Sequence, residues 1–251
     1  ELSERVYPRD IMHHIANAYG SFPGRNLEWD GETIATMPMQ GRFTLATLSA
    51  ELSCDFSLFK YDDVTASYLK ERASKPFEPV DPDPDANYEQ SIDINVADIE
   101  PLVVLPDKIA HNAMPARDLV GTKIDQAFIG SCANGRIEDF AIAAEIMRGK
   151  QVAPGVRMIV TPGSTNVMKE AVAKGYVATL MDAGAVVTNS TCGACYGGHM
   201  GVLGDGEVCI TASTRNFKGR MGSPEAQIYL GSPATVAASA ITGAISDPRE
   251  A

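Results

Sequence analysis

The sequence lacks any long apolar run, and therefore any segment typical of a membrane span. No window approaches the roughly 18 consecutive apolar residues that a spanning helix needs, and the opening ELSERVYPRD lacks the basic and then apolar order of a secretory signal. The chain also lacks an initiator Met, and its first residues already have the pattern of structured sequence, which indicates a processed or trimmed polypeptide. We therefore expect a cytoplasmic protein with no membrane partner.

Positive charge is also scarce. The 251 residues include 21 Lys and Arg against 32 Asp and Glu, which gives a formal net charge of -11 at pH 7. A general field of this sign repels nucleic acid and anionic membrane surfaces, although it still allows a local basic pocket. We expect no nucleic-acid partner.

The cysteines do not fit a disulfide framework, because there are five of them in a long chain. In a reducing compartment such thiols are either buried apolar residues or metal ligands. Cys209 lies inside an apolar strand pattern and Cys54 lies three residues after Glu51, and we predict that both are buried core thiols. That leaves Cys132, Cys192 and Cys195 as candidate ligands.

What the sequence does have is enough apolar content, 45%, to build two core-forming units. Residues 1–75 mix helical and short extended patterns, which predicts a small α/β domain carrying Glu51. Residues 76–100 begin in a segment rich in Pro and acidic residues, which predicts an extended crossover. Residues 101–251 predict a second α/β domain.

Strand and helix patterns alternate in the second domain. We predict strands at IDQAFIG (124–130), VRMIVTPG (156–163), AVVTNST (185–191) and EVCITAS (207–213). The first is followed by a helix over 136–149, and the second by one helix over 165–184. This alternation predicts a mostly parallel sheet, whose ligands collect at the carboxyl ends of the strands.

Unusual residues follow each of these four strands. Cys132 follows the first, a Thr-Pro-Gly-Ser turn the second, Cys192 and Cys195 the third, and STRNFKGR, with Arg215 and Arg220, the fourth. Because parallel strands end at the same edge of a sheet, we expect these segments to meet there.

Three thiolates fit more than one site. Soft sulfur ligands select zinc, copper(I) or an iron-sulfur cluster. A redox dithiol would use only Cys192 and Cys195, and structural zinc would need a fourth ligand, for which His199 is available. An iron-sulfur cluster held by three cysteines leaves one iron open.

An open metal can bind the hydroxyl and carboxylate of a hydroxy acid and help the hydroxyl leave as water. A substrate with several carboxylates needs cationic partners, and guanidinium groups match carboxylates through two parallel hydrogen bonds. Arg136, beside Cys132, and the Arg215 and Arg220 pair are therefore predicted substrate-binding residues.

Long motifs carry a family resemblance. FIGSCANGRIEDF, TPGS, NSTCGACYGGHMG and TRNFKGRMGS, in this order, resemble the large subunits of the aconitase superfamily, closest to the isopropylmalate dehydratase and homoaconitase group. The resemblance implies the three-layer α/β/α units of the aconitase iron-sulfur fold. It also implies a 4Fe-4S cluster on Cys132, Cys192 and Cys195, and a hydro-lyase acting on a hydroxy di- or tricarboxylic acid.

The same resemblance implies roles for other residues. Glu51 would hydrogen-bond around the iron-bound hydroxyl or water, and Arg215 and Arg220 would hold substrate carboxylates. Thr214 stands where aconitase has Asn, which suits the isopropylmalate or homoaconitase side, and Thr47 also replaces an Asn. Cys54, in the ELSCD segment, departs from the family pattern and puts the surroundings of Glu51 in doubt.

The resemblance also implies missing parts. The resembling subunits begin with a long further segment that contributes to the active site, and their serine base lies on a swivel domain or small subunit. We therefore expect such a small subunit or swivel domain as partner. The alternative is a non-catalytic module that binds a cluster or a partner and has lost the reaction.

Overall fold

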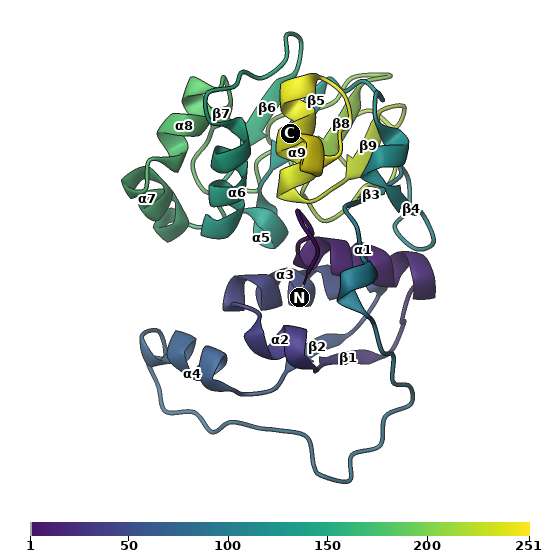
Figure 1. Cartoon of the computed structure of the whole chain (residues 1–251), viewed down its shortest axis with the longest axis vertical. Coiled ribbons are helices and arrows are strands. Elements are labelled where there is room, and N and C mark those ends of the chain that lie inside the picture. The colour runs from purple at the N-terminus through teal and green to yellow at the C-terminus, as the bar shows by residue number, and fades with distance from the viewer. Residues whose placement is uncertain (1) are drawn as a thin grey trace.

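The computed structural model describes residues 2 to 251 and places the chain in two packed units (Figure 1). The first unit combines helices with a two-stranded parallel sheet. Its elements are α1 (Pro8–Tyr19), β1 (Asn26–Trp29), α2 (Glu32–Thr36), α3 (Met39–Ser49), the 3-10 turn η1 (Ala50–Leu52), β2 (Phe56–Phe59) and α4 (Asp63–Lys70).

The second unit is built on a seven-stranded sheet. Its strands are β3 (Leu102–Val104), β4 (Ala113–Pro115), β5 (Gln126–Ile129), β6 (Arg157–Val160), β7 (Val186–Val187), β8 (Val208–Thr211) and β9 (Gln227–Leu230). Its helices are α5 (Ser131–Asn134), α6 (Ile137–Met147), α7 (Thr165–Ala173), α8 (Tyr176–Asp182) and α9 (Pro233–Thr242). The remaining 3-10 turns are η2 (Val96–Asp98), η3 (Ala116–Leu119) and η4 (Pro248–Glu250).

The strands lie in the order β4-β3-β9-β8-β5-β6-β7. From β9 to β7 every neighbouring pair is parallel, whereas β3 is antiparallel to both β9 and β4. The predicted α/β class with a mostly parallel sheet is therefore confirmed. Strand β9, which lies between β8 and β3, was not predicted from the sequence.

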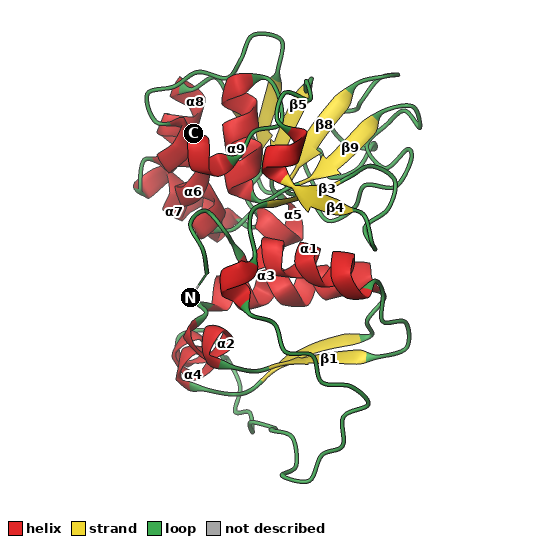
Figure 2. Ribbon diagram, turned by 45° about the vertical axis from the view of Figure 1, so that its right-hand side comes forward, coloured by secondary structure: helices red, strands yellow, loops and turns green. Residues whose placement is uncertain are grey.

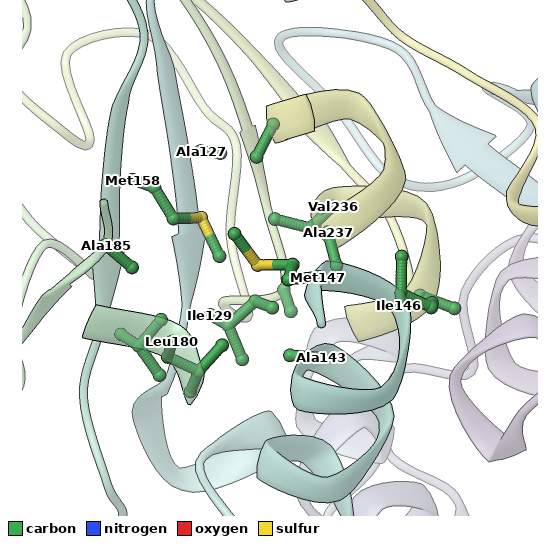
Figure 3. Packing of buried hydrophobic residues seen from close by; sticks show 14 of the residues in the cluster. Ala127, Ile129, Ala143, Ile146, Met147, Met158, Leu180, Ala185, Val236 and Ala237 are labelled. Atoms are coloured by element: carbon green, nitrogen blue, oxygen red, sulfur yellow. The ribbon is translucent and has the colours of Figure 1, made fainter. Parts of the chain in front are cut away.

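Successive residues of a strand face opposite sides of a sheet, and here the two sides are covered differently. Ile129 and Met158 belong to the cluster that packs against the helices, and Figure 3 shows them gathered with Met147 of α6 and Leu180 of α8. All four side chains are buried. Burying such a side chain stabilises the fold by about 1.5 to 3 kcal/mol, so this face holds the main core.

Loops cover the other face. Phe128 and Ile159, which alternate with the residues of the main core, pack there with Ala194, Leu203 and Met221 from the segments after β7 and β8. Within residues 2–251 the residues packed on this face come from strands and loops. The segment after β7 is rich in glycine, which disfavours helix and allows close packing of backbone.

The single helix predicted over residues 165–184 is wrong, because two helices occupy this span. Gly175 has a φ of 77° and separates α7 from α8. This left-handed conformation suits glycine and cannot continue a right-handed helix. None of the helices between residues 2 and 251 combines the length and the apolar character needed to cross a membrane.

Helix α1 joins the two units. Its Ile11, Met12 and Ile15 recur at helical spacing and are buried in the core of the first unit. The helix lies between α3 and the edge of the seven-stranded sheet, as Figure 2 shows. The first unit therefore sits across the end of the sheet where the β5, β6, β7 and β8 strands finish.

The predicted crossover is mostly irregular. Residues 71–95 contain no helix or strand, and most of them are exposed. The segment returns to the first unit at Ile92, Ile94 and Val96, which pack against its core. The domain limits at residues 75 and 100 stay a prediction.

A buried arginine ties the first unit together. The Arg42 side chain is 2% exposed, and its Nη1 and Nη2 donate to Oδ1 and Oδ2 of Asp62 at 2.8 and 2.6 Å. Arg42 also donates to the carbonyls of Met37 and Ile34, which fixes α3 against α2. Asp62 caps α4 by accepting from Thr65 N at 3.0 Å, and its hydrogen bond with Arg42 lowers its pKa to about 2.

We expect Asp62→Asn to destabilise the first unit at neutral pH. Asn caps a helix as well as Asp, so the change removes only the negative charge beside the buried Arg42 and costs about 1 to 3 kcal/mol. The Asp62 pKa is about 2 in the folded chain, against an ordinary value of 3.8. The stabilisation is therefore present above about pH 4 and is lost between pH 4 and 2.

Urea unfolding of both proteins at pH 7 and at pH 2.5 measures this effect. The midpoints should differ at pH 7, and the difference should be clearly smaller at pH 2.5. Equal midpoints at pH 7 would show that the charge pair adds nothing.

Candidate active site

Cys132 lies in the short helix α5, directly after the buried strand β5. Ser131, at the start of α5, has a φ of 73°, a left-handed conformation that turns the chain sharply at the strand end. The Cys132 thiol is free, and the residue is exposed. Arg136 Nη2 donates to Cys132 O at 2.9 Å and so holds the backbone of this turn.

The Cys132 turn packs tightly against the turn after β6. Gly163 N donates to Gly135 O at 2.6 Å. A Cβ on Gly135 would lie 2.8 Å from three backbone atoms, Gly163 N, Ser131 O and Thr161 O. Only glycine fits at this position, so the two turns are held at backbone contact distance.

Cys192 and Cys195 lie in the loop after β7. Cys195 N donates to Cys192 O at 3.0 Å, which closes a turn around Gly193. Gly193 has a φ of 56°, and a Cβ there would clash with the Thr161 hydroxyl. Cys192 is exposed and Cys195 is buried. This loop therefore packs against the same β6 turn as the Cys132 turn.

Arg220 holds the Cys195 turn. Its Nε donates to Cys195 O at 3.0 Å, and its Nη2 lies 3.5 Å from Cys195 Sγ. The guanidinium carbon also lies 5.6 Å from the ring centroid of Phe217 and 6.0 Å from that of Tyr196.

Glu51 and Arg215 form an ion pair between the two units. Arg215 Nε lies 2.9 Å from Oε1 and 2.8 Å from Oε2 of Glu51. The Glu51 side chain is only 10% exposed, whereas that of Arg215 is 45% exposed. Burial raises the pKa of Glu51, and the hydrogen bond from Arg215 opposes this rise. The pair brings η1 to the loop after β8.

The three candidate ligands influence one another electrostatically. Partial burial raises the pKa of Cys132, and negative charges on Cys195 and Cys192 raise it further. In the described part of the chain, no three His, Cys, Asp or Glu side chains converge closely enough to hold a single metal ion. A cluster spaces its thiolates more widely, because each iron takes its own ligand.

A small cavity lies beside Glu51. Its volume is about 10 Å³, which is close to the room that one water molecule needs. Glu51, His13 and Thr214 contribute polar groups to a lining that is otherwise apolar. Thr214, predicted to bind substrate, is 7% exposed and so is almost fully buried here.

Three buried polar atoms around the site have no hydrogen-bond partner among the described residues. They are Ser190 Oγ, Ser213 Oγ and Arg136 Nε. Buried polar groups are usually satisfied, and unsatisfied ones often mark a place that a ligand or water completes. Each of the three lies within four residues of a predicted ligand or substrate-binding residue.

The structure also places the residues considered as alternatives. His199, the candidate fourth zinc ligand, is exposed. Cys209 is buried, and burial raises its pKa to about 12, as a core thiol requires. Cys54 is half-buried and packs against the core of the first unit. Cys209 is thus a core thiol, as predicted, whereas Cys54 is only partly buried and the prediction of a buried core thiol is wrong for it.

A buried polar group on α1 was not predicted from the sequence. Arg9, Asp10 and His13 are all at most 3% exposed. Burial raises the pKa of Asp10 to about 7 and, with the charge of Arg9, lowers that of His13 to about 3. The only signal in the sequence is their position among apolar residues of one helix, which is also typical of a surface helix.

The fold and the site define a class: an α/β protein that gathers cysteines and arginines at the carboxyl edge of a parallel sheet, where such sheets bind ligands. The family model described as "Aconitase family (aconitate hydratase)" matches residues 1–115 and 107–243. The chain belongs to the aconitase family, as its motifs predicted.

Named relatives are similar over nearly the whole chain. The 3-isopropylmalate dehydratase large subunit of Mycolicibacterium smegmatis is 52% identical over 245 residues, which are 98% of this chain and 58% of that relative. The subunit of the same name from Moorella thermoacetica is 45% identical over 252 residues, 100% of this chain and 60% of the relative. The chain thus spans less than two thirds of the length of these relatives.

We expect Gly135→Ala to destabilise the chain by about 1 to 3 kcal/mol, because its Cβ would meet backbone atoms that cannot move aside. Gly204→Ala is the matched control. There the nearest atom is Glu207 Oε2 at 3.8 Å, an ordinary contact with a flexible side chain. Denaturant unfolding measures both changes, and equal midpoints for the two variants would contradict the close packing described here.

Proposed function

We propose that this chain is the cluster-binding portion of an iron-sulfur hydro-lyase that removes and adds water on a hydroxy di- or tricarboxylic acid. The observation that carries the proposal is the meeting of two sets of groups at one sheet edge. Three free cysteines lie in turns after β5 and β7, and the Glu51–Arg215 pair lies at the loop after β8. Together they offer soft metal ligands, a cation for a carboxylate and a group for proton transfer.

The residues present fit a 4Fe-4S cluster. Cys132, Cys192 and Cys195 are its proposed ligands, and thiolates are the donors that such clusters take. Arg220, within 3.5 Å of Cys195 Sγ, supplies positive charge beside them. The unpartnered Ser190 hydroxyl lies two residues before Cys192 and offers a further hydrogen bond there. When bound, a cluster with one open iron supplies a Lewis acid for the substrate hydroxyl.

Arg215 and Arg220 are the proposed carboxylate-binding residues. Arg215 donates to Glu51 only through Nε, so its Nη1 and Nη2 have no partner among the described residues. These two groups can bind a carboxylate while the ion pair stays intact. Arg136 and Thr214 are proposed to complete the substrate contacts, with Arg136 also holding the Cys132 turn.

Glu51 is the proposed group that holds or moves a proton at the substrate hydroxyl. Its burial raises its pKa, and the hydrogen bond and charge of Arg215 oppose this rise. A carboxylate so placed can exchange a proton with the substrate hydroxyl. The pairing also fixes the carboxylate in one orientation. A non-catalytic module would have no need for this buried, oriented acid beside three free thiols.

The substrate class and partner follow from the relatives' names. Because they are called 3-isopropylmalate dehydratase large subunits, we propose a substrate of the isopropylmalate or homoaconitate type and a small subunit or swivel domain as partner. The chain spans only 58% to 60% of these relatives. Complete activity is therefore proposed for the chain together with the remaining portion and its partner, in the cytoplasm.

Reconstitution tests the cluster. Under anaerobic conditions with iron and sulfide, the chain should bind about four irons and gain visible absorption, and Cys132→Ser or Cys192→Ser should abolish stable binding because a soft ligand is lost. Cys54→Ser is the control and should load like the original. Stoichiometric zinc on the same cysteines, with no iron bound, would overturn the iron-sulfur proposal.

The role of Arg215 is tested in the complete enzyme. Arg215→Lys keeps the charge but loses the planar fork, so kcat/KM should fall roughly 10- to 150-fold, equivalent to about 1.5 to 3 kcal/mol, with unchanged iron content. Arg157→Lys is the control, because Arg157 also binds a carboxylate in a two-point pair, with Glu207, but at the opposite strand ends. Wild-type kinetics for Arg215→Lys would remove Arg215 from the substrate site.

A further inference from the structure

We propose that Arg9 is a positioning residue that fixes the Cys132 turn and the Arg215 loop relative to each other, and that its buried positive charge serves the thiolate site. The inference rests on the proposed function for its chemical meaning. It adds a residue of the first unit that lies in none of the motifs at the strand ends. Its basis is the set of contacts that one guanidinium makes.

Arg9 is completely buried and contacts two other segments as well as its own helix. Its Nε donates to Asn134 Oδ1 at 2.7 Å, its Nη1 lies 3.5 Å from His13 Nε2, and its Nη2 donates to the carbonyl of Ala212. Asn134 is the last residue of α5, which carries Cys132. The planar fork therefore makes one rigid connection from α1 to both strand ends.

The contact with Asn134 continues into the base of the Cys132 turn. Asn134 Nδ2 donates to Asp139 Oδ1 at 2.9 Å, and Asp139 Oδ2 accepts from Arg136 N at 2.8 Å. Both Asn134 and Asp139 are buried. A movement of the Arg9 fork would thus be transmitted to the residues on both sides of the turn.

The contact with Ala212 fixes the start of the loop after β8, which carries Arg215. Ala212 follows β8 directly, and its own N donates to Phe128 O at 2.8 Å in the neighbouring strand. Its carbonyl accepts from Arg9, so both backbone groups of the residue are bound. Arg215 comes three residues later and reaches Glu51 from there. The loop therefore leaves the sheet in a direction set by α1.

The charge of Arg9 is unusual because it has no direct counter-charge. No ion pair within 4.0 Å joins Arg9 to a carboxylate in the part of the chain described, and its hydrogen-bond acceptors are all neutral. A buried charge without a partner is costly. Burial lowers the pKa of Arg9 to about 10, while the charges of Asp139, Asp10, Glu51 and Cys132 oppose this.

Arg9 therefore stays charged at neutral pH, close to an acid and a thiol of the site. Thiolates bound to a cluster add negative charge at this edge, and a fixed buried cation stabilises them. Arg9 would need no carboxylate partner of its own, because these thiolates supply the negative charge. A purely structural arginine would be expected to resemble Arg42, whose charge is neutralised by Asp62.

Arg42 provides the matched control. It is as buried as Arg9 and also ties helices together, but its contacts lie within the first unit. Arg9→Lys and Arg42→Lys both keep the charge and lose the fork, so both should lower the free energy of unfolding. Only Arg9→Lys should disturb the site.

Hydrogen exchange of the chain without iron is the first measurement. Arg9→Lys should raise exchange about tenfold in residues 131–136 and 212–215, whereas Arg42→Lys should raise it in residues 34–37 and 62–66 only. Thr44 Oγ1 still donates to Ala133 O at 3.1 Å, so α5 loosens without unfolding. Asn134→Ala should loosen residues 131–136 and leave 212–215 unchanged, because the Ala212 contact remains.

Iron loading is the second measurement. Arg9→Lys should need about tenfold more iron and sulfide for half-loading, and after reduction with dithionite it should broaden the electron paramagnetic resonance spectrum of the cluster. Arg9→Met should load less than Arg9→Lys because it also loses the charge, and Arg42→Lys should load within about twofold of the original. If Arg9→Met does not fold, the comparison of Arg9→Lys with Arg42→Lys still decides.

The outcomes separate this proposal from the proposed function. If the original chain binds no iron, the cluster assignment fails. The exchange data still show whether Arg9 positions residues 131–136 and 212–215. If Arg9→Lys and Arg42→Lys change exchange and loading in the same way, Arg9 is only a structural residue and the proposal is wrong. Unchanged exchange at residues 131–136 and 212–215 in Arg9→Lys would also overturn it.

Discussion

The parallel pairing of β8, β5, β6 and β7 is the constraint on which the site depends. Thr211 pairs with Phe128, Ile129 with Val160, and Val160 with Val187, so these strands end at nearly the same level. Each chain segment that leaves a strand end therefore starts beside the others. Residues 132, 163, 192 and 213 are far apart in sequence, and the hydrogen-bonded ladder brings them to one edge.

The first unit closes that edge with a buried polar layer. Asp10 accepts from Leu102 N at 2.9 Å and from Tyr7 N at 2.9 Å, while His13 Nδ1 lies 3.4 Å from Leu102 O. Buried polar groups are stable only when their partners are in place, so this layer fixes the orientation of α1 on the sheet. Because α1 packs on α3, the same layer fixes Glu51, in the η1 turn that follows α3, opposite Arg215.

The sequence predicts the part of this arrangement that depends on local patterns. The strand and helix alternation places Cys132, Cys192 and Cys195 at strand ends without knowledge of the fold. The Glu51–Arg215 pair spans 164 positions, and only the family resemblance pointed to both residues. Arg9 could not be predicted, because a charged residue on an amphipathic helix is usually exposed. The break at Gly175 was missed because an isolated glycine is often tolerated within a helix.

The N–H donors of Arg215 serve two purposes: one holds Glu51 of the first unit, and the others are left for a ligand. Nε binds both oxygens of Glu51, so the ion pair uses one of the five N–H donors of the guanidinium. The other four belong to the two Nη groups, on a side chain that is 45% exposed. A carboxylate that binds them adds a negative charge close to Glu51, which favours the protonated form of this acid. In the proposed function, substrate binding and proton uptake by Glu51 would therefore be coupled through a single side chain, whose placement depends on the loop that starts at Ala212.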